Sequence, residues 1–176
     1  MGDMPRDRAA EAVIITGAFG TGKSSVAVEM ADILDARGMP YAVVDLDFLS
    51  WFSTGRAEDG IEHRLLLLNL GDIARNYLAV GVRYFVLARA LRDQSELESL
   101  QGCLGMPQRV VRLTTSLEEI ERRLGADVTT ARRDDLREAR EWLDRSVGQD
   151  LGDLVVANDR PIHEVASEIL DWLGWE

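Results

Sequence analysis

The stretch Gly17-Ala18-Phe19-Gly20-Thr21-Gly22-Lys23-Ser24 decides how this chain of 176 residues folds. It matches the pattern G-x-x-x-x-G-K-[ST], in which glycines let the backbone curl until successive amides face inward as a nest for anions. The apolar run Val13-Ile14-Ile15 comes directly before it, and an amphipathic pattern through Val26, Met30, Ile33 and Leu34 follows it. A strand, a glycine-rich turn and a helix in this order form the setting that the pattern requires. The sequence therefore predicts a phosphate-binding loop rather than a chance glycine-rich turn.

The residues of this loop have separate expected tasks. Lys23 would reach the β- and γ-phosphates of a nucleotide, and the Ser24 hydroxyl would ligate Mg²⁺ that arrives with it. The helix N-terminus adds unpaired N–H groups and a favourable dipole for phosphate. The expected nucleotide contacts are Gly17, Gly20, Thr21, Gly22, Lys23, Ser24 and Ser25. We therefore expect ATP and Mg²⁺ as cofactors, although the motif itself does not separate ATP from GTP.

Apolar runs of strand length recur along the chain and alternate with helical patterns. After the first run they are Tyr41-Ala42-Val43-Val44, Tyr84-Phe85-Val86-Leu87, Val110-Val111 with Leu113, and Leu154-Val155-Val156-Ala157. Short continuous runs rich in β-branched residues are typical of strands buried on both faces, and alternation with helices implies parallel crossovers. The expected fold is α/β, with three α/β/α layers around a five-stranded parallel sheet. We expect one domain over residues 1–176, with residues 1–11 as a mobile tail.

Composition and charge narrow the range of partners. The formal net charge is −11, which repels nucleic acid, and no apolar run approaches the about 20 residues that cross a bilayer. The N-terminus is polar and acidic, unlike a signal peptide. A single cysteine, Cys103, forms no internal disulfide and fits the reducing cytoplasm. We expect a cytoplasmic protein with a nucleotide and a small molecule as partners, without nucleic acid or membrane, and of open oligomeric state.

The whole arrangement resembles the small-molecule kinases built on such a loop, the group that includes adenylylsulfate, gluconate, shikimate and nucleoside monophosphate kinases. The resemblance covers most of the chain. It rests on the loop, on Asp45-Leu46-Asp47 after the second strand run, and on an arginine-rich segment after the fourth. It implies a P-loop NTPase fold with a helical lid at about residues 116–145. It also implies Mg²⁺-dependent transfer of the γ-phosphate of ATP to a small-molecule acceptor.

Polar residues follow the second and third strand runs, at the edge of the sheet where ligands bind in open α/β folds. Asp47 could orient or deprotonate an acceptor hydroxyl there, and we favour it over Asp45 for this role. Capping of the following turn is the alternative for both carboxylates. Arg89 and Arg92 could hold an anionic acceptor or the transferring phosphate, or could be solvated surface residues.

The resemblance also assigns arginines of the lid and of the last loop. Arg122, Arg132 and Arg133 are the candidates that would close over the phosphates, with Arg132 counted as catalytic and Arg122 as a nucleotide contact. Closure excludes water and favours transfer over hydrolysis. Arg160 would contact the nucleotide beside the adenine. The alternative for the lid is a solvated helix face held by pairs such as Glu118 with Arg122.

Several positions depart from the adenylylsulfate kinases, which read Asp-Gly-Asp followed by Asn and Arg. Leu46, Phe48 and Ser50 stand at the Gly, Asn and Arg positions, which argues against adenylylsulfate as the acceptor. No aspartate ends the third strand run, and no Asn-Lys-x-Asp follows a later one. Motor ATPases, transporters and signalling GTPases are disfavoured on these grounds.

Two questions stay open at the level of the sequence. Three aromatic residues, Trp51, Phe52 and Tyr77, could line an acceptor pocket for a planar or apolar group, or could belong to the core. The function itself has a rival: a nucleotide-binding regulatory or partner-binding protein without transfer activity. An exposed Asp47 that faces Lys23 would favour the kinase, whereas a cleft filled by Trp51 and Phe52 would favour the rival.

Overall fold

The computed structural model describes residues 9–55, 60–125 and 130–176, with the backbone alone for residues 130–133. The strands are β1 (Glu11–Thr16), β2 (Tyr41–Asp45), β3 (Tyr84–Ala88), β4 (Gln108–Thr114) and β5 (Leu154–Ala157). The helices are α1 (Lys23–Ala36), the 3₁₀ turn η1 (Leu46–Ser50), α2 (Ile61–Ala79), α3 (Gln94–Leu104), α4 (Leu117–Gly125), α5 (Thr130–Asp144) and α6 (Ile162–Leu173). All five predicted strands are present. Glu11 already belongs to β1, so the sheet takes the last residue of the predicted tail, and residues 1–8 lie outside the described part of the chain.

The sheet is parallel throughout, with strand order β2-β3-β1-β4-β5. Val13 of β1 pairs with Val86 of β3 on one side and with Arg109 of β4 on the other. The strand order therefore changes direction at β1, and a crevice opens beyond the carboxyl ends of β1 and its neighbours. The glycine-rich loop leaves β1 at this point, which is where ligands bind in doubly wound folds.

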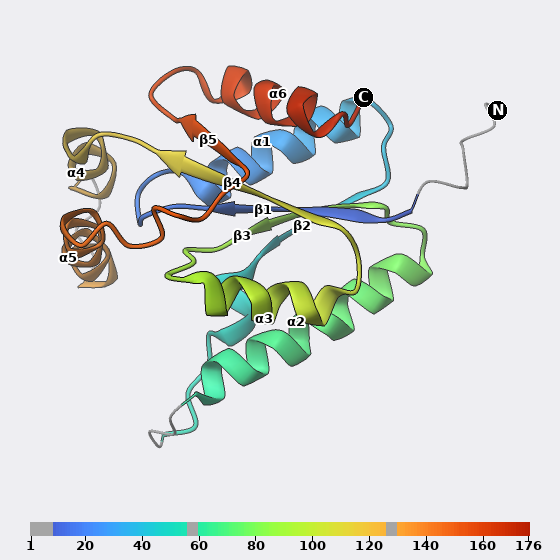
Figure 1. Cartoon of the computed structure of the whole chain (residues 1–176), viewed down its shortest axis with the longest axis horizontal. Helices are drawn as coiled ribbons and strands as arrows, with labels where there is room; N and C mark the ends of the chain where they lie inside the picture. Colours follow the sequence, from blue (N-terminus) through green and yellow to red (C-terminus); the bar gives the residue numbers. More distant parts are fainter. Residues whose placement is uncertain (1–8, 56–59, 126–129) are drawn as a thin grey trace.

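Two helical layers cover the sheet, α1 with α6 on one face and α2 with α3 on the other (Figure 1). Each layer buries its own apolar cluster against the strands. The first contains Met30, Ile169 and the wholly buried Trp175, whose ring lies 5.0 Å from that of Tyr84. The three-layer α/β/α prediction is confirmed. No helix of the described residues is long and apolar enough to span a bilayer.

The predicted lid region holds two helices, α4 and α5, which lie together beyond the carboxyl edge of the sheet (Figure 1). They share a small apolar cluster of their own, in which Ile120, Leu124 and Ala139 are buried and Phe19 of the glycine-rich loop packs against them. The lid helices therefore rest on the tip of the loop rather than on the main core.

Candidate active site

The glycines of the loop hold backbone conformations that other residues rarely adopt. Gly17, Gly20 and Gly22 have φ angles of 140°, 78° and 92°. A Cβ atom on Gly17 would lie 2.5 Å from the carbonyl oxygen of Leu113, and one on Gly22 would lie 2.5 Å from Nδ2 of Asn158. Such approaches are too close for any side chain. The loop therefore needs glycine both for its curl and for its close contact with the ends of β4 and β5.

Lys23 opens α1 and folds back over the loop. Its Nζ donates a hydrogen bond to the carbonyl oxygen of Ala18 at 3.0 Å, and the hydroxyl of Thr21 donates to the same oxygen at 2.9 Å. The side chain is buried, and burial lowers the pKa of Lys23 from 10.5 to about 8, against the opposing effect of Asp47 and Asp45. A buried ammonium inside a curl of backbone amides is suited to take the charge of a polyphosphate.

Ser24 reaches the end of β2. Its hydroxyl donates to Oδ2 of Asp45 at 2.6 Å, while Oδ1 of Asp45 accepts from the backbone N–H of Asp47 at 3.1 Å. Ser25 is exposed beside Ser24 in the first turn of α1. Hydroxyl and carboxylate oxygens are the ligands that Mg²⁺ prefers, so Ser24 and Asp45 fit the predicted metal. Within the described residues, no three His, Cys, Asp or Glu side chains gather in a way that could hold a metal ion.

Asp47 and Arg89 meet at the ends of neighbouring strands. The guanidinium of Arg89 donates to Oδ1 of Asp47 at 3.3 Å, with the Arg89 side chain mostly buried and the Asp47 side chain 55% exposed. Burial raises the pKa of Asp47, as does Asp45, whereas Arg89 and Lys23 oppose the rise. Asp47 thus lies close enough to Lys23 for each to shift the pKa of the other. The predicted pair of Asp47 and Lys23 is brought together, with Asp47 open to solvent.

Arg89 also lines a cavity of about 520 Å³. The starts of α2 and α3 form it, through residues that include His63, Arg92 and Asp93. Its volume lies in the range of small-molecule sites, and its lining offers both hydrogen-bond donors and acceptors. Arg92 also lies 3.9 Å from a carboxylate oxygen of Glu138 on α5, so it connects the cavity with the lid helices.

Among the lid arginines whose side chains the structure describes, Arg123 reaches the loop. Its guanidinium donates to the carbonyl oxygens of Thr21 at 3.3 Å and Asn158 at 2.8 Å. Arg122, which the sequence analysis assigned to the nucleotide, is 71% exposed and bonds to both carboxylate oxygens of Glu119. Bonds from Arg122 and Arg123 lower the pKa of Glu119 to about 2. The helix turns about 100° per residue, so Arg122 lies nearly opposite the buried Ile120. This spacing was visible in the sequence and indicates that Arg122 faces the solvent.

Asn158, at the end of β5, is a further site residue that sequence reasoning missed. It is buried, and its side-chain amide donates to the carbonyl oxygen of Thr21 at 2.7 Å. Nothing in its local sequence distinguishes it from a turn residue, because its role depends on the approach of β5 to the loop. Arg160, two residues later, forms an ion pair with Glu168 of α6 instead of turning to the loop. The side chains of Arg132 and Arg133 lie outside the described residues.

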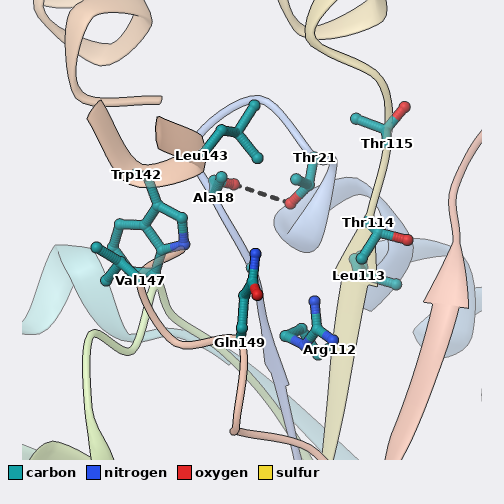
Figure 2. Close-up of a pocket in the computed structure, with 11 residues that line it drawn as sticks. Ala18, Thr21, Arg112, Leu113, Thr114, Thr115, Trp142, Leu143, Val147 and Gln149 are labelled. Atoms are coloured by element: carbon teal, nitrogen blue, oxygen red, sulfur yellow. Dashed lines mark hydrogen bonds between the residues drawn. The ribbon is translucent and has the colours of Figure 1, made fainter. Parts of the chain in front are cut away.

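Trp142 of α5 covers the loop from the lid side (Figure 2). Its ring meets that of Phe19 edge to face, with centroids 6.3 Å apart. A small cavity of about 60 Å³ remains between the loop, β4 and α5, with Thr21, Arg112 and Gln149 among its lining residues (Figure 2). A pocket for a small molecule has at least about 300 Å³, so this gap is too small for a nucleotide.

No protein-family model matches this sequence, and neither does any curated protein. Solved structures do match over nearly the whole chain. The APS kinase of Mycobacterium tuberculosis, solved with AMPPNP and APS, has a TM-score of 0.60 at 22% identity and covers 94% of this chain and 98% of that one. The tunicamycin resistance protein of Deinococcus radiodurans has a TM-score of 0.65 at 19% identity, covering 95% and 96% of the two chains. A gluconokinase from Sinorhizobium meliloti 1021 has a TM-score of 0.63 at 21% identity, covering 95% and 93%. The chain therefore has the P-loop NTPase fold of these structures, two of which are small-molecule kinases.

Proposed function

We propose that this protein transfers the γ-phosphate of ATP to a hydroxyl group of a small-molecule acceptor. The observation that supports the proposal is the meeting of Lys23, Ser24 and Asp47 at the carboxyl edge of β1 and β2. Lys23 and Ser24 begin α1 and Asp47 follows β2, and each of the three suits one part of phosphoryl transfer. Positioning and electrostatic stabilisation supply most of the catalysis in such reactions.

The donor side of the site would hold the nucleotide. The amides of the glycine-rich loop and the Lys23 ammonium would bind the β- and γ-phosphates. Ser24 and Asp45 would hold Mg²⁺, which supplies positive charge against the phosphate oxygens when bound. Arg123 and Asn158 would stabilise the conformation of the loop, because both already donate hydrogen bonds to the carbonyl oxygen of Thr21.

The acceptor side would place a hydroxyl at Asp47. The raised pKa of Asp47 makes its carboxylate a better proton acceptor than an ordinary aspartate. The acceptor oxygen forms a bond to the γ-phosphorus while the bond from that phosphorus to the β–γ bridging oxygen breaks. The hydroxyl proton passes to Asp47, and ADP leaves. Arg89 would hold the Asp47 carboxylate in place through the bond that it already makes.

The rival function is a nucleotide-binding module without transfer activity, and the exposure of the acceptor side argues against it. The Asp47 side chain is 55% exposed, so a small molecule can reach it. Trp51 is 79% exposed, so it does not fill the space beside Asp47. A nucleotide-binding module without transfer activity has no need of an exposed carboxylate close enough to the phosphate-binding lysine to shift its pKa.

Replacement of Asp47 by asparagine separates binding from transfer. We expect Asp47→Asn to keep ATP affinity within about twofold and to slow acceptor-dependent ATP consumption by about a hundredfold or more, the usual effect of losing a general base. Asp72→Asn is the matched control, because Asp72 is exposed on α2 and pairs only with Arg75 among the ion pairs found. Equal transfer rates in Asp47→Asn and the parent would remove Asp47 from the mechanism.

A further inference from the structure

The segment directly after Asp47 holds two large aromatic side chains in solvent. Phe48 is 65% exposed and Trp51 is 79% exposed. Their rings stack on each other, with centroids 5.6 Å apart and an interplanar angle of 27°. Two exposed aromatic rings that stack on each other form a small apolar patch, unlike the single apolar residues that are scattered on most surfaces.

The geometry of η1 explains why this pair lies beside the site. A 3₁₀ helix has three residues per turn, so side chains three residues apart share a face. Leu46 and Leu49 form the inner face, with Leu46 fully buried and Leu49 packed against the α2 and α3 core. Asp47 projects from the next face toward Arg89. Phe48 lies on the remaining face, adjacent to that of Asp47, and Trp51, directly after the turn, stacks on the Phe48 ring.

The turn is also anchored, so the aromatic face has a defined position. The backbone N–H of Asp47 is bonded to Asp45, and the carbonyl oxygen of Leu49 accepts from the side-chain amide of Asn69 on α2 at 2.8 Å. An acceptor with its hydroxyl at Asp47 thus has a fixed pair of flat apolar rings next to it.

We propose that Phe48 and Trp51 bind a planar aromatic or heteroaromatic group of the phosphoryl acceptor. This inference rests on the proposed function, and it names the class of acceptor: a hydroxyl compound that carries a flat ring. A planar group can stack on the exposed ring face, where it gains both apolar burial and the preferred offset-stacked arrangement.

The exposed area fits a small molecule better than a protein. An aromatic side chain has roughly 250 Å² at most to bury, so the exposed parts of Phe48 and Trp51 total under about 400 Å². A stable protein interface needs about 800 Å² on each partner. The aromatic rings also lie next to the face of the turn that carries Asp47, which favours the phosphoryl acceptor as the molecule that they bind.

Matched glycosides test the proposal. The first pair is phenyl β-D-glucoside and methyl β-D-glucoside, and the second is uridine and methyl β-D-ribofuranoside, so that the members of each pair carry the same sugar and differ in whether the attached group is planar or a methyl. Acceptor-dependent ATP consumption gives kcat and KM, and quenching of tryptophan fluorescence reports binding at Trp51. Trp142 and Trp175 are buried and Trp172 is partly buried, so Trp51 is the tryptophan most open to such a probe.

We expect the planar member of a pair to have a kcat/KM about tenfold higher, mainly through KM. The double variant Phe48→Ala with Trp51→Ala should abolish this preference and the fluorescence quenching. Tyr77→Ala is the matched control, because Tyr77 is an exposed aromatic residue near the far end of α2, and it should keep the preference.

The outcomes separate this proposal from the function on which it rests. Phosphoryl transfer with equal kcat/KM within both pairs, or a planar preference that survives in the double variant, overturns the aromatic site and leaves the kinase. Quenching at Trp51 by the planar probes without transfer supports the aromatic site and contradicts the kinase. If none of the four probes quenches the fluorescence or reacts, the aromatic site is overturned. It is also overturned if the protein self-associates in sedimentation and Trp51→Ala does not, because the rings would then bind a second copy of the chain.

Discussion

The burial of Lys23 in the phosphate-binding loop lowers the stability of the folded protein. Its pKa of about 8 means that the fold disfavours the charged ammonium, which an unfolded chain would hold with a pKa of 10.5. Because the pKa falls on folding, the penalty on stability is complete below pH 8 and fades as the pH rises toward 10.5. A bound polyphosphate would reverse this effect by favouring the charged form.

Lys23→Met should therefore stabilise the nucleotide-free protein at pH 7, by up to about 3 kcal/mol, the equivalent of the lowered pKa. The carbonyl oxygen of Ala18 keeps its bond from Thr21 in the variant, so no acceptor is left unpaired. Urea unfolding at pH 7 and at pH 10.5 would measure the effect, and the gain should disappear at the higher pH. If Lys23→Met were less stable than the parent at pH 7, burial of the charged lysine would not destabilise the folded protein.

The same residue should take up protons when nucleotide binds. Near pH 8 about half of the Lys23 side chains are neutral in the free protein, and phosphate charge raises the pKa again. We expect MgATP binding at pH 8 to take up about half a proton, measured by calorimetry in buffers of different ionisation enthalpy. Lys23→Arg, whose guanidinium is always charged, is the control and should take up none.

Arg123 and Arg122 are neighbours that should behave in opposite ways. Arg123→Ala removes the bonds to Thr21 and Asn158, so we expect ATP affinity to fall about tenfold as the loop loosens. Arg122→Ala removes only an exposed ion pair with Glu119 and should change affinity by less than about twofold. Titration of both variants with ATP checks the contrast, and a larger loss in Arg122→Ala would restore the role assigned from sequence.

At the residue scale, the sequence predicted the parts of the site that a short motif contains. Lys23 and Ser24 follow from the glycine-rich pattern, and Asp47 from its place after a strand. Asp45 received less weight than its bond to Ser24 warrants, because a carboxylate that caps a turn and one that serves a metal look alike in sequence. Asn158 was missed because only the tertiary fold brings it to the loop.

At the scale of elements, periodicity located every strand but not the irregular pieces. Buried parallel strands are continuous apolar runs, so each was visible. The 3₁₀ turn η1 was not predicted, since five residues are too few to show a period. The charged stretch read as a helical lid contains α4 and α5, and residues 126–129 between them lie outside the described part of the chain.

The packing of α5 on the loop gives a prediction at this scale. Trp142→Ala removes a buried ring that meets Phe19, and we expect a loss of about 3 kcal/mol in the free energy of unfolding. Leu143→Ala, at the next and more exposed position of α5, is the control and should cost less than about 1 kcal/mol. Urea denaturation measures both, and similar losses would mean that α5 does not dock through Trp142.

At the scale of the whole molecule, the strand order was the part that sequence could not supply. Alternating strands and helices restrict a parallel sheet to right-handed crossovers, but they do not say which strand is central. The order β2-β3-β1-β4-β5 puts the loop between the end of β2, which supplies Asp45 and Asp47, and the end of β5, which supplies Asn158. The topology therefore assembles the site, whereas the sequence alone indicated Lys23, Ser24 and Asp47 separately.

Nucleotide binding at this crevice should stabilise the whole fold. MgATP at about 100 times its Kd should raise the free energy of unfolding by about 2.7 kcal/mol. Thermal unfolding with and without MgATP measures the shift, and Lys23→Ala should lose most of it. A shift of equal size in Lys23→Ala would place the nucleotide somewhere other than the glycine-rich loop.

Phosphoryl transfer from ATP is tested by measuring ATP consumption with Mg²⁺ against pools of small hydroxyl compounds, in the parent and in Lys23→Ala. We expect consumption that depends on a pool, that vanishes in Lys23→Ala, and that leads to one acceptor when the active pool is divided. Consumption that persists in Lys23→Ala would contradict the assignment of the site. Tight ATP binding with no consumption in any pool would contradict the kinase and favour a nucleotide-binding module.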